Sequence, residues 1–121
     1  MERKFDLEDR LIEFASQIIL FTDSVKPTKA GNHISGQLLR SGTSPALNYG
    51  EAQSGESRRD FFHKIKVILK ELRESRIALK IIEKSKLHED IEFLQKLKNE
   101  CNQLISIFVK SVETAEKNNK I

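Results

Sequence analysis

Histidine, cysteine and paired acids are the residue types through which a small protein most often performs catalysis or holds a metal ion. The histidines His33, His63 and His88 fall in different parts of the chain, and none has a second ligand at metal-binding spacing. Asp60 and His63 form one Asp-x-x-His pair, whereas a di-iron bundle needs two such motifs and a carboxylate from each of four helices. Cys101 is the only cysteine, which excludes an internal disulfide and a Cys-rich zinc site. We therefore expect no enzymatic activity, cofactor or metal.

A second group of side chains is polar in a way that suits structure better than catalysis. Its first four members lie four, four and three residues apart, so a continuous helix places them on one face: Arg40, Ser44, Asn48 and Glu51. The carboxylates of Glu71 and Glu74 follow on the next predicted helix. We expect these six residues to form a buried or interfacial network that fixes register or partner choice, with direct ligand contact as the alternative.

Basic residues are concentrated in one part of the chain. Residues 57–86 carry ten Lys or Arg against four acidic residues, while the whole chain has a net charge of only +3. Helical spacing places these side chains on one face, interrupted only by Ile77: Arg59, His63, Lys66, Lys70, Arg73, Lys80 and Lys84. Such a stripe suits a phosphate backbone, so Arg59, Lys66, Lys70, Arg73, Lys80 and Lys84 are the predicted nucleic-acid contacts. An acidic protein surface would use the same stripe, and a solvent-facing helix needs solubilising charge in any case.

The elements that position these residues are predicted to be four helices. Apolar side chains recur at intervals of three and four over residues 6–25, 30–53, 57–84 and 88–117. The clearest pattern is a heptad seam in the third segment, at Phe61, Ile65, Ile68, Leu72, Leu79 and Ile82, with Ser75 in the gap. Pro45 interrupts the second segment, where we expect one kinked helix rather than a break.

The connections between these segments are short, so each helix must run opposite to the one before it. The predicted fold is all-α, an antiparallel up-down-up-down four-helix bundle that forms a single domain over residues 1–121. No apolar run approaches the roughly 20 residues needed to cross a bilayer, and we expect a soluble cytoplasmic protein. Extra apolar stripes on the first and last helices suit either a wide core face or a subunit interface.

Several of these residues also carry a family resemblance. They are Arg40-Ser41-Gly42-Thr43-Ser44, then Asn48, Glu51-Ala52 and Phe61, and finally Lys70-Glu71 with Glu74. The chain resembles the bacterial four-helix-bundle proteins named after intervening sequences in 23S ribosomal RNA genes. The resemblance runs from about residue 14 to 84 and more loosely through the last helix. Many relatives carry an aromatic pair, often ending in Trp, just after residues 71–75, where this chain has Arg76, Ile77 and Ala78.

This resemblance implies an antiparallel subunit that assembles into a ring-shaped homopentamer. A similar family, the accessory variability protein of diversity-generating retroelements, uses a basic ring to bind a reverse transcriptase and nucleic acid. By that analogy Lys66, Lys70 and Arg73 would contact phosphate. The expected function is a non-enzymatic oligomer that binds RNA or DNA. The alternative is a protein-interaction scaffold, for example for a reverse transcriptase, without direct nucleic-acid contact.

Overall fold

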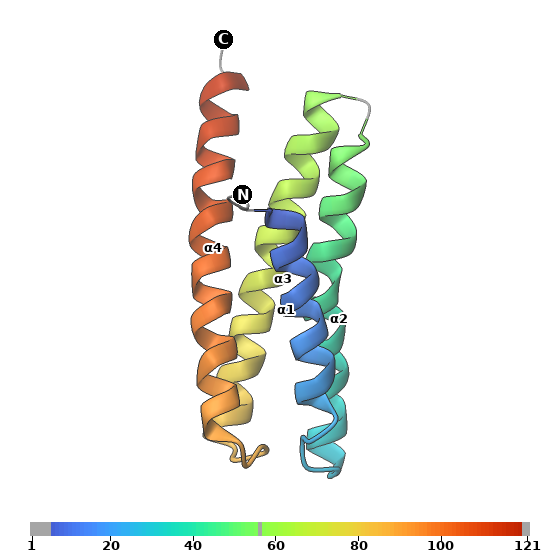
Figure 1. The fold of residues 1–121 in the computed structure, drawn as a ribbon, viewed down its shortest axis with the longest axis vertical. Coiled ribbons are helices and arrows are strands. Elements are labelled where there is room, and N and C mark those ends of the chain that lie inside the picture. Colours follow the sequence, from blue (N-terminus) through green and yellow to red (C-terminus); the bar gives the residue numbers. More distant parts are fainter. Residues whose placement is uncertain (1–5, 56, 120–121) are drawn as a thin grey trace, which may run out of the picture.

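The computed structural model describes residues 6–55 and 57–119, and this part of the chain forms four helices and no strand. They are α1 (Leu7–Thr22), α2 (Lys29–Gln53), α3 (Arg58–Lys84) and α4 (Ile91–Asn119). In Figure 1 the chain runs down α1, up α2, down α3 and up α4. Close backbone contacts join α1 to α2, α2 to α3, α3 to α4 and α4 back to α1, so α1 and α3 lie diagonally opposite. The prediction of an all-α four-helix bundle is confirmed.

Side-chain caps determine where the helices begin. A helix leaves its first backbone N–H groups without partners, and a short polar side chain just before it accepts hydrogen bonds from them. The residues that do so here are Asp6, Thr28, Ser57 and Asp90. The cap at Asp90 places the start of α4 at Ile91, three residues later than the sequence predicts. The first helix, α1, ends at Thr22, three residues before its predicted end at residue 25.

Pro45 lies inside α2 and does not break it, because the helix is continuous from Lys29 to Gln53. The expectation of one helix is confirmed on this point. Proline has no N–H, so the carbonyl of Ser41 loses its usual helical donor. Pro45 is nevertheless buried, which shows that its ring contributes to packing.

The core is formed by the stripes that the apolar periodicity predicts. In α1 the buried side chains are Leu11, Phe14, Ile18 and Phe21. In α3 the seam is buried from Ile65 to Ile82, and Ser75 in its gap is fully buried. Phe61 is the exception: it was predicted as a core residue, yet 38% of its surface is exposed. It lies near the start of α3, beyond the level that α1 reaches.

Candidate nucleic-acid interface

The predicted basic residues lie along the outer face of α3. All six side chains are exposed: Arg59, Lys66, Lys70, Arg73, Lys80 and Lys84. At a rise of 1.5 Å per residue, the first and last of them are roughly 38 Å apart along the helix. His63 is exposed on the same face, and Ile77, which interrupts it, is 50% exposed. We call the six cations the basic face.

Within residues 6–55 and 57–119, the basic face forms no direct ion pairs, although Lys70 lies near Glu74 and Lys80 near Glu83. Cations that point sideways behave differently, since Lys64 pairs with Glu51 and Lys98 of α4 pairs with Glu83. The six side chains of the basic face therefore remain available to contact an anionic partner.

Lys66 has one further contact that bears on its role. Its Nζ lies 5.0 Å from the centre of the Phe62 ring, within the range of a cation–π interaction. Phe62 is half-buried and Lys66 stays exposed, so the ring fixes the lysine stem without covering its charge. A lysine held in this way loses less side-chain freedom when an anion binds.

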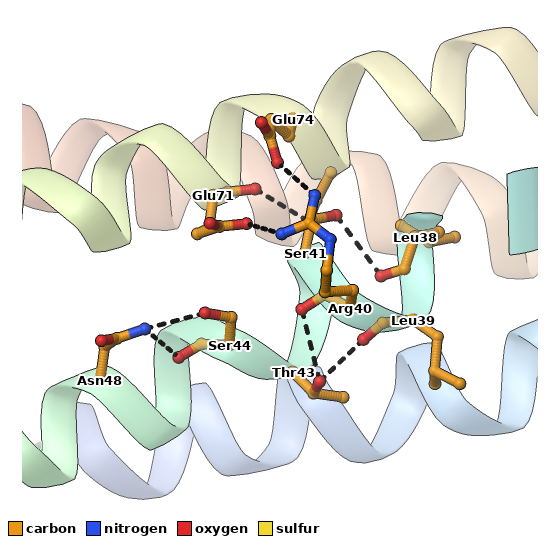
Figure 2. A network of polar contacts seen from close by, with 10 residues as sticks. Leu38, Leu39, Arg40, Ser41, Thr43, Ser44, Asn48, Glu71 and Glu74 are labelled. Carbon is orange, nitrogen blue, oxygen red and sulfur yellow. Dashed lines mark hydrogen bonds and ion pairs between the residues drawn. The ribbon is translucent and has the colours of Figure 1, made fainter. Parts of the chain in front are cut away.

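The predicted polar network divides into three separate sets. Arg40 reaches from α2 across to α3, where its guanidinium donates to Glu71 at 3.0 Å and to Glu74 at 2.9 Å (Figure 2). Ser44 and Asn48 form the second set within α2, where the side-chain amide of Asn48 donates to Ser44 Oγ at 2.8 Å. No side-chain hydrogen bond between described residues joins this second set to the Arg40 set.

Glu51 forms the third set with Lys64 of α3, which lies outside the six residues of the predicted network. Four residues on one face of a helix thus point to three different partners. Helical spacing shows which side chains lie on the same face of a helix, but the residues they contact depend on the neighbouring helix. Only Arg40, Glu71 and Glu74 are joined as expected.

The two carboxylates around Arg40 differ in environment. Burial raises the pKa of Glu71 above its ordinary value, and the nearby charge of Glu74 raises it further, while Arg40 acts in the opposite direction. The hydrogen bond from Arg40 lowers the pKa of Glu74. The side chain of Glu71 is 10% exposed and that of Glu74 is 41% exposed. Arg40 is therefore the cation that favours the ionised form of the buried Glu71.

The sequence predicts no metal site, and the possible ligands in the described part of the chain bear on that prediction. No three His, Cys, Asp or Glu side chains there converge closely enough to hold a metal ion. The thiol of Cys101 is buried, donates to the carbonyl oxygen of Leu72 and has its pKa raised to about 12 by burial. A thiol with that pKa is a poor nucleophile at neutral pH. The same part of the chain includes no helix long and apolar enough to cross a membrane.

Comparison with known proteins gives the family. The family model described as 23S rRNA-intervening sequence protein matches residues 3–110. The chain belongs to the 23S rRNA-intervening sequence protein family. It is also similar to a crystal structure from Bacteroides thetaiotaomicron, described as a protein with unknown function from the S23 ribosomal protein family, with a TM-score of 0.80 and 26% identity. That likeness covers 88% of this chain and 98% of the other. A comparison with curated proteins gave no match.

This 23S rRNA-intervening sequence protein also holds buried polar contacts that its sequence did not suggest. The hydroxyls of Ser41 on α2 and Ser75 on α3 lie 2.9 Å apart in the core. Figure 2 shows Ser41 beside the Arg40 cluster. Serines at apolar positions of both helices were the available signal, but only Ser75 was placed in the seam. Arg10 joins α1 to α4 through Glu100 at 2.6 Å, a pairing across 90 residues that no local pattern reveals.

The Arg40 cluster yields a stability prediction for this family member. Replacing Arg40 with Ala should lower the thermal midpoint at pH 7 more than replacing Lys84 with Ala does. The reason is that Arg40→Ala leaves the buried carboxylate of Glu71 without its cation, while Lys84 is exposed and forms no ion pair in the described residues. Thermal unfolding followed by circular dichroism measures both variants, and equal midpoints would contradict this reading.

The same cluster sets the expected pH dependence of the Arg40→Ala penalty. Arg40 acts to lower the pKa of both carboxyls, so its loss raises both, and the folded variant binds protons more tightly than the folded wild type. Below the lowered pKa of Glu74 both carboxyls are protonated in either protein, and the electrostatic part of the difference should vanish. It should grow as the pH rises through the ordinary glutamate pKa of 4.5 and beyond. A difference that is constant from pH 3.5 to 8 would exclude this linkage.

Proposed function

We propose that this protein is a non-enzymatic, oligomeric binding protein that engages RNA or DNA in the cytoplasm through the basic face of α3. The observation that carries the proposal is the row of six exposed cations, none of them in an ion pair within the described residues, over roughly 38 Å of one helix. The five intervals between successive cations are three to seven residues long, so the positive charges follow one another along the helix.

Phosphate is the part of nucleic acid that such a surface fits. Lysine is a compact point charge and arginine a planar fork, and both contact phosphate oxygens regardless of sequence. Each neutralised phosphate releases condensed counterions, so binding weakens steeply as salt increases. A straight helix face presents no loop or aromatic platform for reading bases. We therefore expect backbone binding with little sequence preference.

Assembly into a ring-shaped homopentamer of antiparallel subunits belongs to the same proposal. Its support is the resemblance described above, together with large apolar side chains left exposed on a single subunit. On α1 these are Leu20, at 56% exposure, and Ile12 and Ile19, seven residues apart on one face, at 47% and 46% exposure. Apolar stripes of this kind are typical of subunit interfaces. A ring would repeat the basic face in every subunit and so strengthen weak phosphate contacts through multivalency.

Charge reversal tests the nucleic-acid proposal directly. The triple variant Lys66→Glu, Lys70→Glu, Arg73→Glu should bind a short RNA or DNA duplex at least about tenfold more weakly at 0.1 M salt, because three phosphate contacts become repulsions. The slope of log affinity against log salt should fall by about 2.7 if each side chain contacts one phosphate of B-form DNA. Fluorescence anisotropy over a salt series measures both quantities.

The matched control reverses three exposed lysines away from α3, in the variant Lys29→Glu, Lys96→Glu, Lys117→Glu, which changes net charge equally. It should keep most of the affinity and the salt slope. Light scattering of both variants verifies that the assembly is intact. If the α3 variant and the control bind alike, the basic face is not the binding surface.

A second candidate function is a protein-interaction scaffold, such as an adaptor for a reverse transcriptase. The observation that favours it is a groove of about 560 Å³ between α2 and α3, where Ile34, Ile77 and Ile81 lie beside Lys70 and Arg73. Ile77 and Ile81 are 50% and 44% exposed, and apolar side chains flanked by cations suit an acidic protein better than a phosphate backbone. Pull-downs that survive nuclease treatment would support the scaffold.

A further inference from the structure

The bundle has an open end, because α1 is much shorter than the other helices. It contains 16 residues, against 25, 27 and 29 in α2, α3 and α4. At 1.5 Å per residue, the other helices are longer by about 13 to 20 Å. Figure 1 shows that α2, α3 and α4 continue past the start of α1, where the fourth position of the bundle is not filled by any described residue.

A groove of about 630 Å³ lies at this open end. Its apolar lining comes from the side chain at the start of α1, Leu7, from Phe61, Phe62 and Ile65 of α3, and from Ile107 and Phe108 of α4. Phe61 continues the heptad seam that is buried from Ile65 onward along α3. The core stripe of α3 therefore extends beyond the helix that covers it, and this explains why Phe61 is exposed.

The polar lining of the groove has one sign of charge. Arg58 and Lys110 both line it, and no acidic side chain does so among the residues that the structure describes. Both cations are exposed, and neither belongs to a described ion pair. At the α1 end, burial and the charges of Asp6 and Glu8 raise the pKa of Tyr49, so the positive part of the groove is its α3 and α4 side. An occupant is therefore attracted through its acidic groups toward Arg58 and Lys110.

We propose that this groove docks an amphipathic, acidic helix of a partner protein, which lies in the fourth-helix position that α1 leaves open. Three helices that continue without a fourth form a trough of the width of a helix, and helix-in-groove recognition uses apolar side chains at intervals of three and four. The open length of about 13 to 20 Å accommodates two to four helical turns. The glutamates or aspartates of the partner flank its apolar stripe and face Arg58 and Lys110. None of these residues belongs to the basic face, although Arg58 adjoins Arg59 and the ring of Phe62 contacts Lys66.

The test uses a fluorescein-labelled synthetic peptide of about 14 residues, with leucines at helical intervals of three and four and glutamates at the flanking positions. Fluorescence anisotropy with the full-length protein should give saturable binding in the micromolar range. The double variant Arg58→Glu, Lys110→Glu should weaken it at least tenfold, and Phe61→Ser should do the same. The control double variant Lys29→Glu, Lys96→Glu, at the other end of the bundle, should leave it within twofold. A peptide with lysines in place of glutamates should bind at least tenfold more weakly than the acidic one.

Location is tested separately with a benzophenone at one leucine position of the acidic peptide. Crosslinks should map to the beginning of α3 and the last third of α4. No saturable binding, equal binding of the acidic and basic peptides, or crosslinks on the outer face of α3 would each overturn the proposal. A subunit mass that falls in light scattering when Phe61 becomes Ser would also overturn it, because a second copy of the chain would then be the occupant.

Discussion

Replacing Gly31 with Ala should lower the free energy of unfolding by about 2 to 4 kcal/mol, a large loss for a protein of this size. A Cβ atom at this position would overlap the carbonyl oxygen of Lys26 and lie 3.1 Å from its carbonyl carbon. Both are backbone atoms, so no change of rotamer relieves the overlap. The whole turn between α1 and α2 would have to move.

That turn cannot move freely, because several hydrogen bonds hold it. The carbonyl of Lys26 accepts from the N–H of Thr28 at 2.8 Å, and the hydroxyl of Thr28 accepts from the N–H of Gly31 at 2.9 Å. The N–H of Lys26 donates to the carbonyl of Leu87 at 2.8 Å, which joins this turn to the one between α3 and α4. A shift that accommodates the new methyl group therefore strains both turns at this end of the bundle.

Gly36 provides the matched control for this substitution. It also lies in α2, it is exposed, and a Cβ atom there would meet no atom within 4 Å. Gly36→Ala should raise stability by about 0.5 to 1 kcal/mol, because alanine loses less backbone entropy in a helix than glycine does. Urea denaturation followed by circular dichroism compares the two variants. If Gly31→Ala unfolds at the same urea concentration as Gly36→Ala or at a higher one, the Lys26 carbonyl does not lie close to Gly31.

The apolar seam is the part of the fold that the sequence predicts best, and the reason is periodicity. Ile65, Ile68, Leu72, Leu79 and Ile82 are buried because a helix that packs on its neighbours can hide only one stripe. The same rule places the basic face outside, since the positions opposite a buried seam are left to solvent. Both results depend only on the spacing of residues within one helix.

Where the prediction failed, the missing information concerned a second helix. Phe61 has the spacing of a core residue, but its burial depends on whether α1 extends far enough to cover it. Glu51 leaves α2 on the same face as Arg40, yet its partner Lys64 is decided by the register of α2 against α3. Pairings such as that of Arg10 with Glu100 likewise depend on which helices become neighbours. The spacing of residues within one segment contains no information on helix register or on which helices become neighbours.

His88 shows the same limit at a turn, where no periodicity exists to read. From the sequence it was only a histidine without a metal-binding partner, at the start of a predicted helix. In the structure it is 5% exposed and precedes α4. Its ring stacks on that of Phe21 with centroids 3.9 Å apart and planes 4° from parallel. A residue of the α3–α4 connection thus covers the end of α1.

The hydrogen bonds of His88 explain why a histidine suits this place. The Nδ1 atom accepts from the N–H of Asp90 at 3.0 Å, which leaves the proton on Nε2. That proton is donated to the carbonyl oxygen of Phe21, 3.1 Å away at the end of α1. The neutral ring therefore satisfies two backbone groups at a helix end and a turn, and at the same time packs against an aromatic side chain.

Replacing His88 with Ala should cost about 2 to 4 kcal/mol of stability, since it removes the stacked ring and leaves the N–H of Asp90 without its acceptor. His88→Phe should cost less, about 1 to 2 kcal/mol, because the ring remains while both hydrogen bonds are lost. His63→Ala, on the exposed face of α3, should stay within about 0.5 kcal/mol of the wild type. Urea denaturation at pH 8 measures all three, with equal slopes required for the comparison. The order that supports this role is His63→Ala most stable, then His88→Phe, then His88→Ala. If His88→Ala were as stable as His63→Ala, the stack and the two hydrogen bonds would not hold the end of α1 against the α3–α4 turn.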